Sequence, residues 1–276
     1  MGFVPHHEIV VADGAAPTRT VFVLHGIFGS GRNWTAFARR FVAASPEWRA
    51  VLVHLRGHGG SRDAPGPHTM AACSADLTAL TEAVGSPDVV WGHSFGGKVV
   101  LQWLRDAPEI GSRQVWSFDS PPGDGPAGGG DPLSSEVGLL ITALREIAEP
   151  LARRADAQEE LRDRGLSRAV AGWMATNLVR RDDGYRWHFD IATLEPLLRD
   201  YWHTDLWPLC DHPPADVDVH LVRAADSDRW SDVDRARLDE VASGGGASVH
   251  VLPRAGHWLH VDAPQALLTL LLGHLI

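Results

Sequence analysis

The segment Gly92–Gly96 reads Gly-His-Ser-Phe-Gly and joins two stretches of different character. The apolar residues 89–91 before it predict a buried strand, and the residues from Phe95 onwards predict a helix. A serine between such elements sits in a tight, strained turn, and the flanking glycines leave room for the neighbouring backbone. The turn presents the hydroxyl of Ser94 at the start of a helix, where the helix dipole favours negative charge. The pattern therefore indicates a nucleophilic serine.

The same residues also fit a phosphate-binding pattern. Gly92 to Lys98 matches G-x-x-x-x-G-K, but Val99 occupies the position where a Ser or Thr would bind magnesium. A nucleotide-binding loop is therefore disfavoured, and we expect Lys98 to be solvated on the first turn of the helix.

Short β-rich runs alternate with helical stretches along most of the chain, which is typical of a mostly parallel sheet with helices on both faces. The expected strands are residues 21–25, 51–55, 89–91, 115–119, 219–222 and 249–252, with an edge strand near 8–11. The expected helices are residues 34–43, 70–84, 95–106, 234–242 and 264–274. We expect Asp262 to be the N-cap of the last helix.

A cluster rich in Gly and Pro follows residue 119 and interrupts this alternation. Beyond it, up to about residue 201, the chain is helical in character with no strand signal. We therefore expect one α/β core, residues 1–122 and 208–276, interrupted by a helical cap of residues 123–207. Three tryptophans of the cap fit either an apolar pocket or the cap's own core, namely Trp173, Trp187 and Trp202.

Two backbone N–H groups are candidates for an oxyanion hole beside the serine. The loop His25–Gly29 follows the first buried strand, and a loop in this place provides one backbone N–H of an oxyanion hole, here that of Ile27. The residue after the nucleophile, Phe95, provides the other. Each such donor contributes about 10²–10³ in rate.

His257, one of 15 histidines, has the place expected of a general base. It follows the last predicted strand and comes after the serine and the candidate acids in chain order. His260 lies one helical turn further on and lacks that exit from a strand. Asp119 and Asp226 each follow the carboxyl end of a strand, so the residues alone leave the identity of the acid open.

Composition excludes several classes of partner. The net charge of −10 provides no basic surface for nucleic acid, and no run of Lys or Arg indicates a membrane surface. Cys73 and Cys210 lie far apart, and no His or Cys spacing indicates a metal. The first 11 residues lack the features of a signal peptide, so a cytoplasmic location is expected. We expect no cofactor and no metal, and the oligomeric state is left open.

Several segments resemble the compact acyl-esterase branch of the α/β-hydrolases, which has bacterial and mitochondrial members. They are HGIFGSGRNW (25–34), LRGHGGS (55–61), GHSFGGK (92–98), residues 118–121, ATNL (175–178) and GHWLH (256–260). The resemblance implies the α/β-hydrolase fold, carboxylesterase activity on short to medium acyl esters or thioesters, no cofactor and a small helical lid.

This resemblance also bears on the acid. The branch uses the position of Asp119, with a serine that assists it at the position of Ser227, whereas Asp226 holds the more usual superfamily position. The chain departs from the branch at His54, where the superfamily commonly has Asp, and at residues 224–228, which read Ala-Ala-Asp-Ser-Asp. The resemblance favours Asp119, with Asp226 as the alternative.

The leading hypothesis is thus a serine hydrolase that cleaves a small acyl ester or thioester through an acyl-enzyme, with Ser94, His257 and an aspartate as its triad. A C–C bond hydrolase or a perhydrolase would use the same residues. A hypothesis of another class is a non-catalytic ligand sensor on the same scaffold, which the presence of all triad candidates disfavours.

Overall fold

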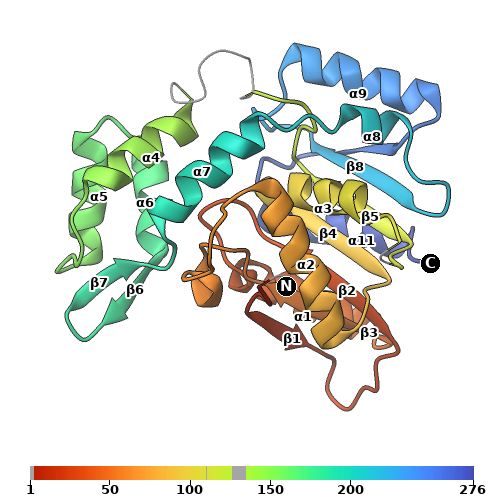
Figure 1. Cartoon of the computed structure of the whole chain (residues 1–276), viewed down its shortest axis with the longest axis horizontal. Coiled ribbons are helices and arrows are strands. Elements are labelled where there is room, and N and C mark those ends of the chain that lie inside the picture. Colours follow the sequence, from red (N-terminus) through yellow and green to blue (C-terminus); the bar gives the residue numbers. More distant parts are fainter. Residues whose placement is uncertain (1–2, 110, 126–134) are drawn as a thin grey trace.

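A seven-stranded sheet lies at the centre of the α/β part of the molecule (Figure 1). The computed structural model describes residues 3–109, 111–125 and 135–276. The sheet has the order β1-β3-β2-β4-β5-β8-β9, in which β1 is antiparallel to β3 and the other neighbours are parallel. Its strands are β1 (His7–Val10), β2 (Arg19–Leu24), β3 (Trp48–Val53), β4 (Val89–His93), β5 (Gln114–Phe118), β8 (Asp218–Ala224) and β9 (Ser248–Leu252). The predicted α/β-hydrolase fold is confirmed, with the first strand at the sheet edge.

Helices cover both faces of this sheet because successive side chains of a buried strand point to opposite sides. In β2, Phe22 and Leu24 pack in the hydrophobic cluster that contains residues of α2 (Met70–Val84), α3 (Phe95–Asp106) and α9 (Asp232–Gly244). Val21 and Val23 pack in a second cluster, with α1 (Thr35–Ala44) and α11 (Pro264–Leu272). Four short helical elements complete this part, namely η1 (Gly31–Trp34), η2 (Gly59–Ser61), α8 (Trp207–Asp211) and α10 (Leu259–Asp262).

The expected capping role of Asp262 is wrong. Ala263 is the N-cap residue of α11, and Asp262 is the last residue of α10. The carboxylate of Asp262 instead accepts the backbone N–H of Gly256 at 3.0 Å. The reason is that the additional helical turn of α10 places this side chain beside the preceding loop.

A group of helices lies to one side of the sheet (Figure 1), and we call it, together with its hairpin, the cap. It contains α4 (Glu136–Glu146), α5 (Arg154–Asp163), α6 (Arg168–Thr176) and α7 (Ile191–Trp202), with a hairpin of β6 (Leu178–Arg181) and β7 (Gly184–Trp187). The absence of strands predicted for this region is therefore wrong. These strands have only four residues each and no alternating apolar pattern, although Asp183-Gly184 is a recognisable turn signal. The boundaries 123 and 207 stay a prediction, and part of the Gly-rich cluster, residues 126–134, lies outside the described residues.

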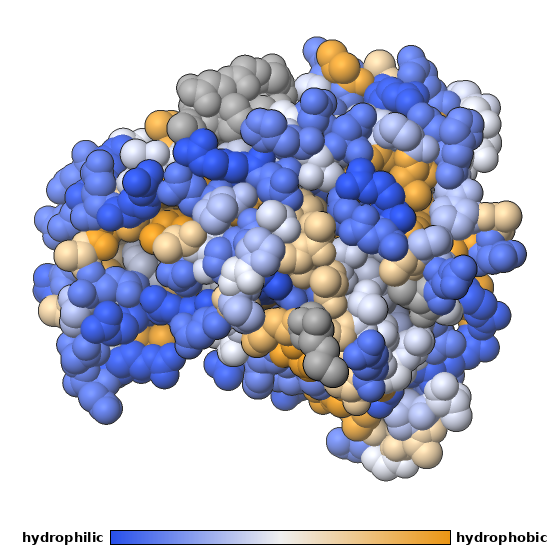
Figure 2. Space-filling model, in the orientation of Figure 1, coloured by the Kyte–Doolittle hydropathy of each residue, from blue (hydrophilic) through white to orange (hydrophobic). Residues whose placement is uncertain are grey.

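One face of the molecular surface is mostly polar, as expected when the apolar side chains are buried. The face in Figure 2 is mostly hydrophilic, with apolar side chains in scattered patches. Among the described residues, no helix combines the length and the apolar character that crossing a membrane requires.

Candidate active site

Ser94 lies in the turn that joins β4 to α3, and its backbone has the strained angles φ 53° and ψ −118°. The neighbouring glycines make this turn sterically feasible. A Cβ on Gly92 would lie 2.2 Å from the carbonyl oxygen of Gly96, and a Cβ on Gly96 would lie 2.6 Å from that of His25. Both contacts are to backbone, which cannot move aside, so this turn requires glycine at both positions.

His257 and Asp119 meet although 138 residues separate them, because the carboxyl ends of parallel strands share one edge of the sheet. His257 Nδ1 lies 2.7 Å from Oδ2 of Asp119, whose side chain is fully buried. The carboxylate also accepts hydrogen bonds from Ser227 Oγ at 2.6 Å, Trp230 Nε1 at 2.8 Å and the N–H of Ala224 at 3.0 Å. Since Nδ1 of His257 donates to a carboxylate, Nε2 is left as the acceptor nitrogen of the neutral ring.

The alternative acid, Asp226, has a different environment. It is exposed, and its backbone N–H donates to the carbonyl of Ala255 at 2.9 Å. The structure therefore brings Asp119 to His257 and leaves the Asp226 side chain in solvent. The neighbouring Ser227 is the residue that contacts the Asp119 carboxylate.

His93 connects the serine turn to the histidine loop. It precedes Ser94 and is buried, and its Nε2 lies 2.7 Å from the carbonyl oxygen of His257. Burial lowers the pKa of His93 well below its usual value, so the ring is neutral at pH 7 and its Nε2–H donates to that carbonyl. His93 was not among the residues predicted from the sequence, because nothing in the local pattern shows which distant group a buried histidine contacts.

Two buried histidines hold the loop that contains Ile27. His25 Nε2 accepts the N–H of Leu55 at 3.1 Å, and His58 Nε2 accepts the N–H of Phe28 at 3.2 Å. The Nδ1 atom of each ring lies within 2.9 Å of a backbone carbonyl, to which it donates. Desolvation lowers both pKa values, that of His58 to about 3, which keeps both rings neutral. These contacts place Ile27 beside Ser94 and Phe95 in the wall of one cavity.

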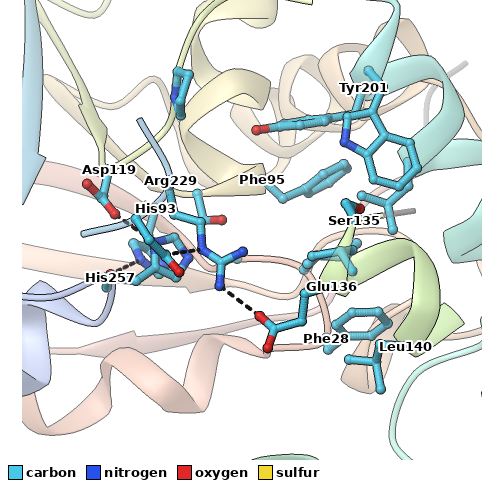
Figure 3. Close-up of a pocket in the computed structure, with 18 of the residues that line it drawn as sticks. Phe28, His93, Phe95, Asp119, Ser135, Glu136, Leu140, Tyr201, Arg229 and His257 are labelled. Carbon is cyan, nitrogen blue, oxygen red and sulfur yellow. Dashed lines mark hydrogen bonds and ion pairs between the residues drawn. The ribbon is translucent and has the colours of Figure 1, made fainter. Parts of the chain in front are cut away.

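That cavity has a volume of about 610 Å³ and lies between the carboxyl edge of the sheet and the cap (Figure 3). Ser94, His257 and Asp119 line one part of it. The cap contributes an apolar part, lined by Val137, Leu140, Val170, Trp173, Leu198 and Trp202. Trp187 is not a lining residue and instead stacks on Phe189 inside the cap. Of the three predicted tryptophans, Trp173 and Trp202 thus face the cavity and Trp187 belongs to the cap's core.

One ion pair spans the cavity between the core and the cap. Arg229, in the loop after β8, contacts Oε2 of Glu136 at the start of α4 at 3.2 Å (Figure 3). The Arg229 side chain also lies 3.3 Å from Oδ1 of Asp228. Its charge is therefore compensated by two carboxylates.

The expectation that Lys98 is solvated is wrong. Its side chain is completely buried, and Nζ donates to the carbonyl oxygens of Gly123 at 2.6 Å, Tyr201 at 3.0 Å and Thr204 at 3.1 Å. The reason is that the connections to the cap cover the first turns of α3, whose residues 95–104 are all buried. Burial lowers the pKa of Lys98 to about 7, whereas the charges of Asp205, Asp124 and Asp234 raise it.

Among the described residues, His6, Glu8 and His54 have the spacing of a metal site, with ligand atoms within 4.8 Å of one another. The N–H of Gly60 donates to Nδ1 of His54 at 3.1 Å, so this nitrogen carries the lone pair and Nε2 carries the proton. Burial lowers the pKa of His54 to about 4, which keeps the ring in this neutral form. The Nε2 atom faces Oε1 of Glu8 at 3.7 Å, and a protonated nitrogen cannot bind a metal. The ion pair of Glu8 with Arg32, whose Nε lies 3.2 Å from Oε1, therefore explains the position of this carboxylate better than metal binding.

The sheet order and the serine turn after β4 define this chain as a hydrolase of the α/β type. The sequence model of the alpha/beta hydrolase family matches residues 21–270, and the chain belongs to that family.

Curated relatives and solved structures agree with this assignment. The chain is 28% identical over 263 residues to the sn-1-specific diacylglycerol lipase ABHD11 of Mus musculus, covering 92% of this chain and 80% of that one. It is 28% identical over 255 residues to the esterase YbfF of Escherichia coli (strain K12), covering 90% and 89% of the two chains. A solved structure described as a marine microorganism esterase superposes with a TM-score of 0.78 at 22% identity and covers 99% of this chain and 100% of its own. The chain is thus an esterase-like hydrolase.

Proposed function

We propose that this protein hydrolyses acyl esters of small molecules, and thioesters of similar size, through an acyl-enzyme on Ser94. The observation that carries the proposal is the 2.7 Å contact between His257 Nδ1 and the buried carboxylate of Asp119, in the wall of the cavity that Ser94 also lines. Relatives named esterase and diacylglycerol lipase support an ester as the substrate class.

The first half of the reaction forms the acyl-enzyme. Ser94 Oγ attacks the acyl carbonyl carbon while Nε2 of His257 takes the hydroxyl proton. The resulting oxyanion accepts the N–H groups of Ile27 and Phe95. The N–H of Phe95, the first residue of α3, has no acceptor within the helix, so it is available for this purpose. The imidazolium then gives its proton to the leaving alcohol or thiol as the ester bond breaks.

The second half restores the enzyme. Water enters, Nε2 of His257 takes one of its protons, and the hydroxide attacks the acyl carbon. The proton returns to Ser94 Oγ as the acid departs. Throughout, Asp119 holds His257 in the tautomer with the proton on Nδ1 and stabilises its charged form. Ser227 assists by donating to the same carboxylate oxygen of Asp119.

The cavity bears on the size of the acyl group. The apolar part contributed by the cap fits a hydrocarbon chain, and 610 Å³ is within the range of about 300–1,000 Å³ usual for small-molecule sites. We propose that the acyl chain occupies this part and that the alcohol or thiol portion leaves toward the opening.

The experiment combines labelling with turnover. A fluorophosphonate probe should label the wild type and not Ser94→Ala, and p-nitrophenyl esters of graded chain length should be hydrolysed. Labelling without hydrolysis of any ester or thioester would reject the proposed substrate class. Absence of both would favour a protein that binds a ligand without converting it.

A further inference from the structure

The two connections between the core and the cap lie side by side. The first connection is residues 121–125 and the second is residues 201–206, at the end of α7. The N–H of Gly125 donates to the carbonyl of Trp202 at 2.6 Å, and the N–H of Leu206 donates to that of Pro122 at 3.0 Å. These hydrogen bonds join the connections to each other but do not attach them to α3, the helix that begins after Ser94.

Lys98 attaches both connections to α3, whereas Arg105 near the end of that helix reaches only the second, through the carbonyl of Asp205 at 3.3 Å. Lys98 is four residues after Ser94 on α3, and it reaches one carbonyl of the first connection (Gly123) and two of the second (Tyr201 and Thr204). An ammonium group has three N–H donors and no acceptor, so these carbonyls use its full capacity. Tyr201 lies in the last turn of α7, and a cation is favoured at the carboxyl end of a helix, where backbone carbonyls lack partners.

The same contacts reach the wall of the cavity. Lys98 Nζ lies 4.0 Å from the centre of the Tyr201 ring, and that ring stacks on Phe95 with centroids 5.5 Å apart. Phe95 and Tyr201 both line the cavity, where Figure 3 shows them next to each other. The backbone N–H of Phe95 is also one of the two donors assigned to the oxyanion.

We propose that Lys98 is a positioning residue that fastens both cap connections to the helix bearing the nucleophile and thereby sets the Phe95–Tyr201 wall of the acyl site. Its effect on substrate choice rests on the proposed function, whereas its effect on the connections does not. Lys98 touches no reacting atom and acts through the carbonyls that it holds.

The test compares Lys98→Met with Gln114→Met as the control. Gln114 is also buried, and its Nε2 donates to the carbonyl of His274 at 2.7 Å. It lies at the amino end of β5, whereas the first connection follows the carboxyl end of that strand, so its loss leaves the connections untouched. At pH 6, where Lys98 is charged, we expect amide hydrogen exchange at Gly125 and Leu206 to become about tenfold faster or more in Lys98→Met, as for the loss of a charge-assisted hydrogen bond. Gln114→Met should keep the wild-type exchange rates. Because Lys98→Arg keeps charged donors, its two amides should exchange more slowly than those of Lys98→Met.

Kinetics provide the readout that a purely structural role would not change. In Lys98→Met, KM for a p-nitrophenyl octanoate should rise more than KM for the acetate, because the wall contacts the longer chain. Exchange that is unchanged at both amides, or equally accelerated in Lys98→Met and Gln114→Met, would overturn the proposal. The exchange measurement needs no turnover, so an absence of esterase activity in the wild type would reject the proposed function without deciding the role of Lys98.

If Lys98→Met does not fold, amide hydrogen exchange of the folded wild type tests the proposal instead. One ammonium group holds both connections, so Gly125 and Leu206 should open together, with similar protection. Protection factors that differ by more than about tenfold, a difference of about 1.4 kcal/mol in opening free energy, would mean that the connections open separately and would refute the proposal.

Discussion

Oδ2 of Asp119 accepts hydrogen bonds from two side chains, Nδ1 of His257 at 2.7 Å and Oγ of Ser227 at 2.6 Å. A carboxylate with four such donors and no exposed surface is held in one orientation, and its charge is stabilised in place. The histidine that it contacts is consequently limited to one tautomer. This relationship gives the proposed mechanism its most direct tests.

Replacing Ser94 with Ala should lower kcat by about 10⁴–10⁶ without unfolding the protein, because the hydroxyl is needed for the chemistry and not for packing. Activity on p-nitrophenyl esters and the circular dichroism melting curve measure the two effects. Ser243→Ala removes an exposed hydroxyl that bonds only within α9 and serves as the control. Activity of Ser94→Ala within tenfold of the wild type would refute the assignment.

Asp119→Asn should lower kcat by up to about 10⁴ at neutral pH, because the amide would favour the wrong tautomer of His257. Asp226→Asn should stay close to the wild type, because the Asp226 side chain is exposed. The two variants have the same chemical change, so each is the control for the other. The assignment fails if Asp226→Asn is the inactive one.

Trp173→Ala should shift the preferred ester chain length more than it lowers the best kcat, because Trp173 lines the apolar part of the cavity. Trp187→Ala removes a cap tryptophan outside the cavity and should instead lower stability, by about 3–5 kcal/mol, with the chain-length profile unchanged. Profiles over graded p-nitrophenyl esters, with urea unfolding, separate these effects. A uniform loss across all chain lengths in Trp173→Ala would contradict a role in selectivity.

Stability should fall as the pH drops below 6.5. Burial lowers the folded-state pKa of His58 and His220 to about 3 and of His54 and His260 to about 4. The unfolded chain binds these protons near pH 6.5 and the folded chain does not, so the stabilisation is complete above pH 6.5 and is lost toward pH 4. Each histidine that takes up a proton on unfolding contributes a slope of about 1.4 kcal/mol per pH unit.

Urea unfolding at pH 7, 6 and 5 measures this slope. His220→Gln should reduce the slope by the contribution of one proton, about 1.4 kcal/mol per pH unit. The reason is that His220 is buried against Trp116 and His250. A free energy of unfolding that is constant between pH 7 and pH 5 would contradict the prediction.

The sequence predicted the elements whose signals are local. Apolar runs identified every strand of the main sheet, and the spacing of glycines around Ser94 identified the turn, because side-chain periodicity and backbone sterics act over a few residues. The β6–β7 hairpin escaped prediction because its strands are short and only partly buried, and their pairing depends on the cap around them.

Tertiary structure decided which polar groups meet. Asp119 and Asp226 both follow strands, and their local sequences do not distinguish them, yet only the approach of the loops after β5, β8 and β9 buries one carboxylate against His257 and leaves the other in water. Lys98 has the local pattern of a solvated residue on a helix and becomes buried because two connections distant in sequence bring carbonyl oxygens to its ammonium group. Periodicity is a property of neighbouring residues, whereas desolvation and charge pairing depend on what the complete fold places around a side chain.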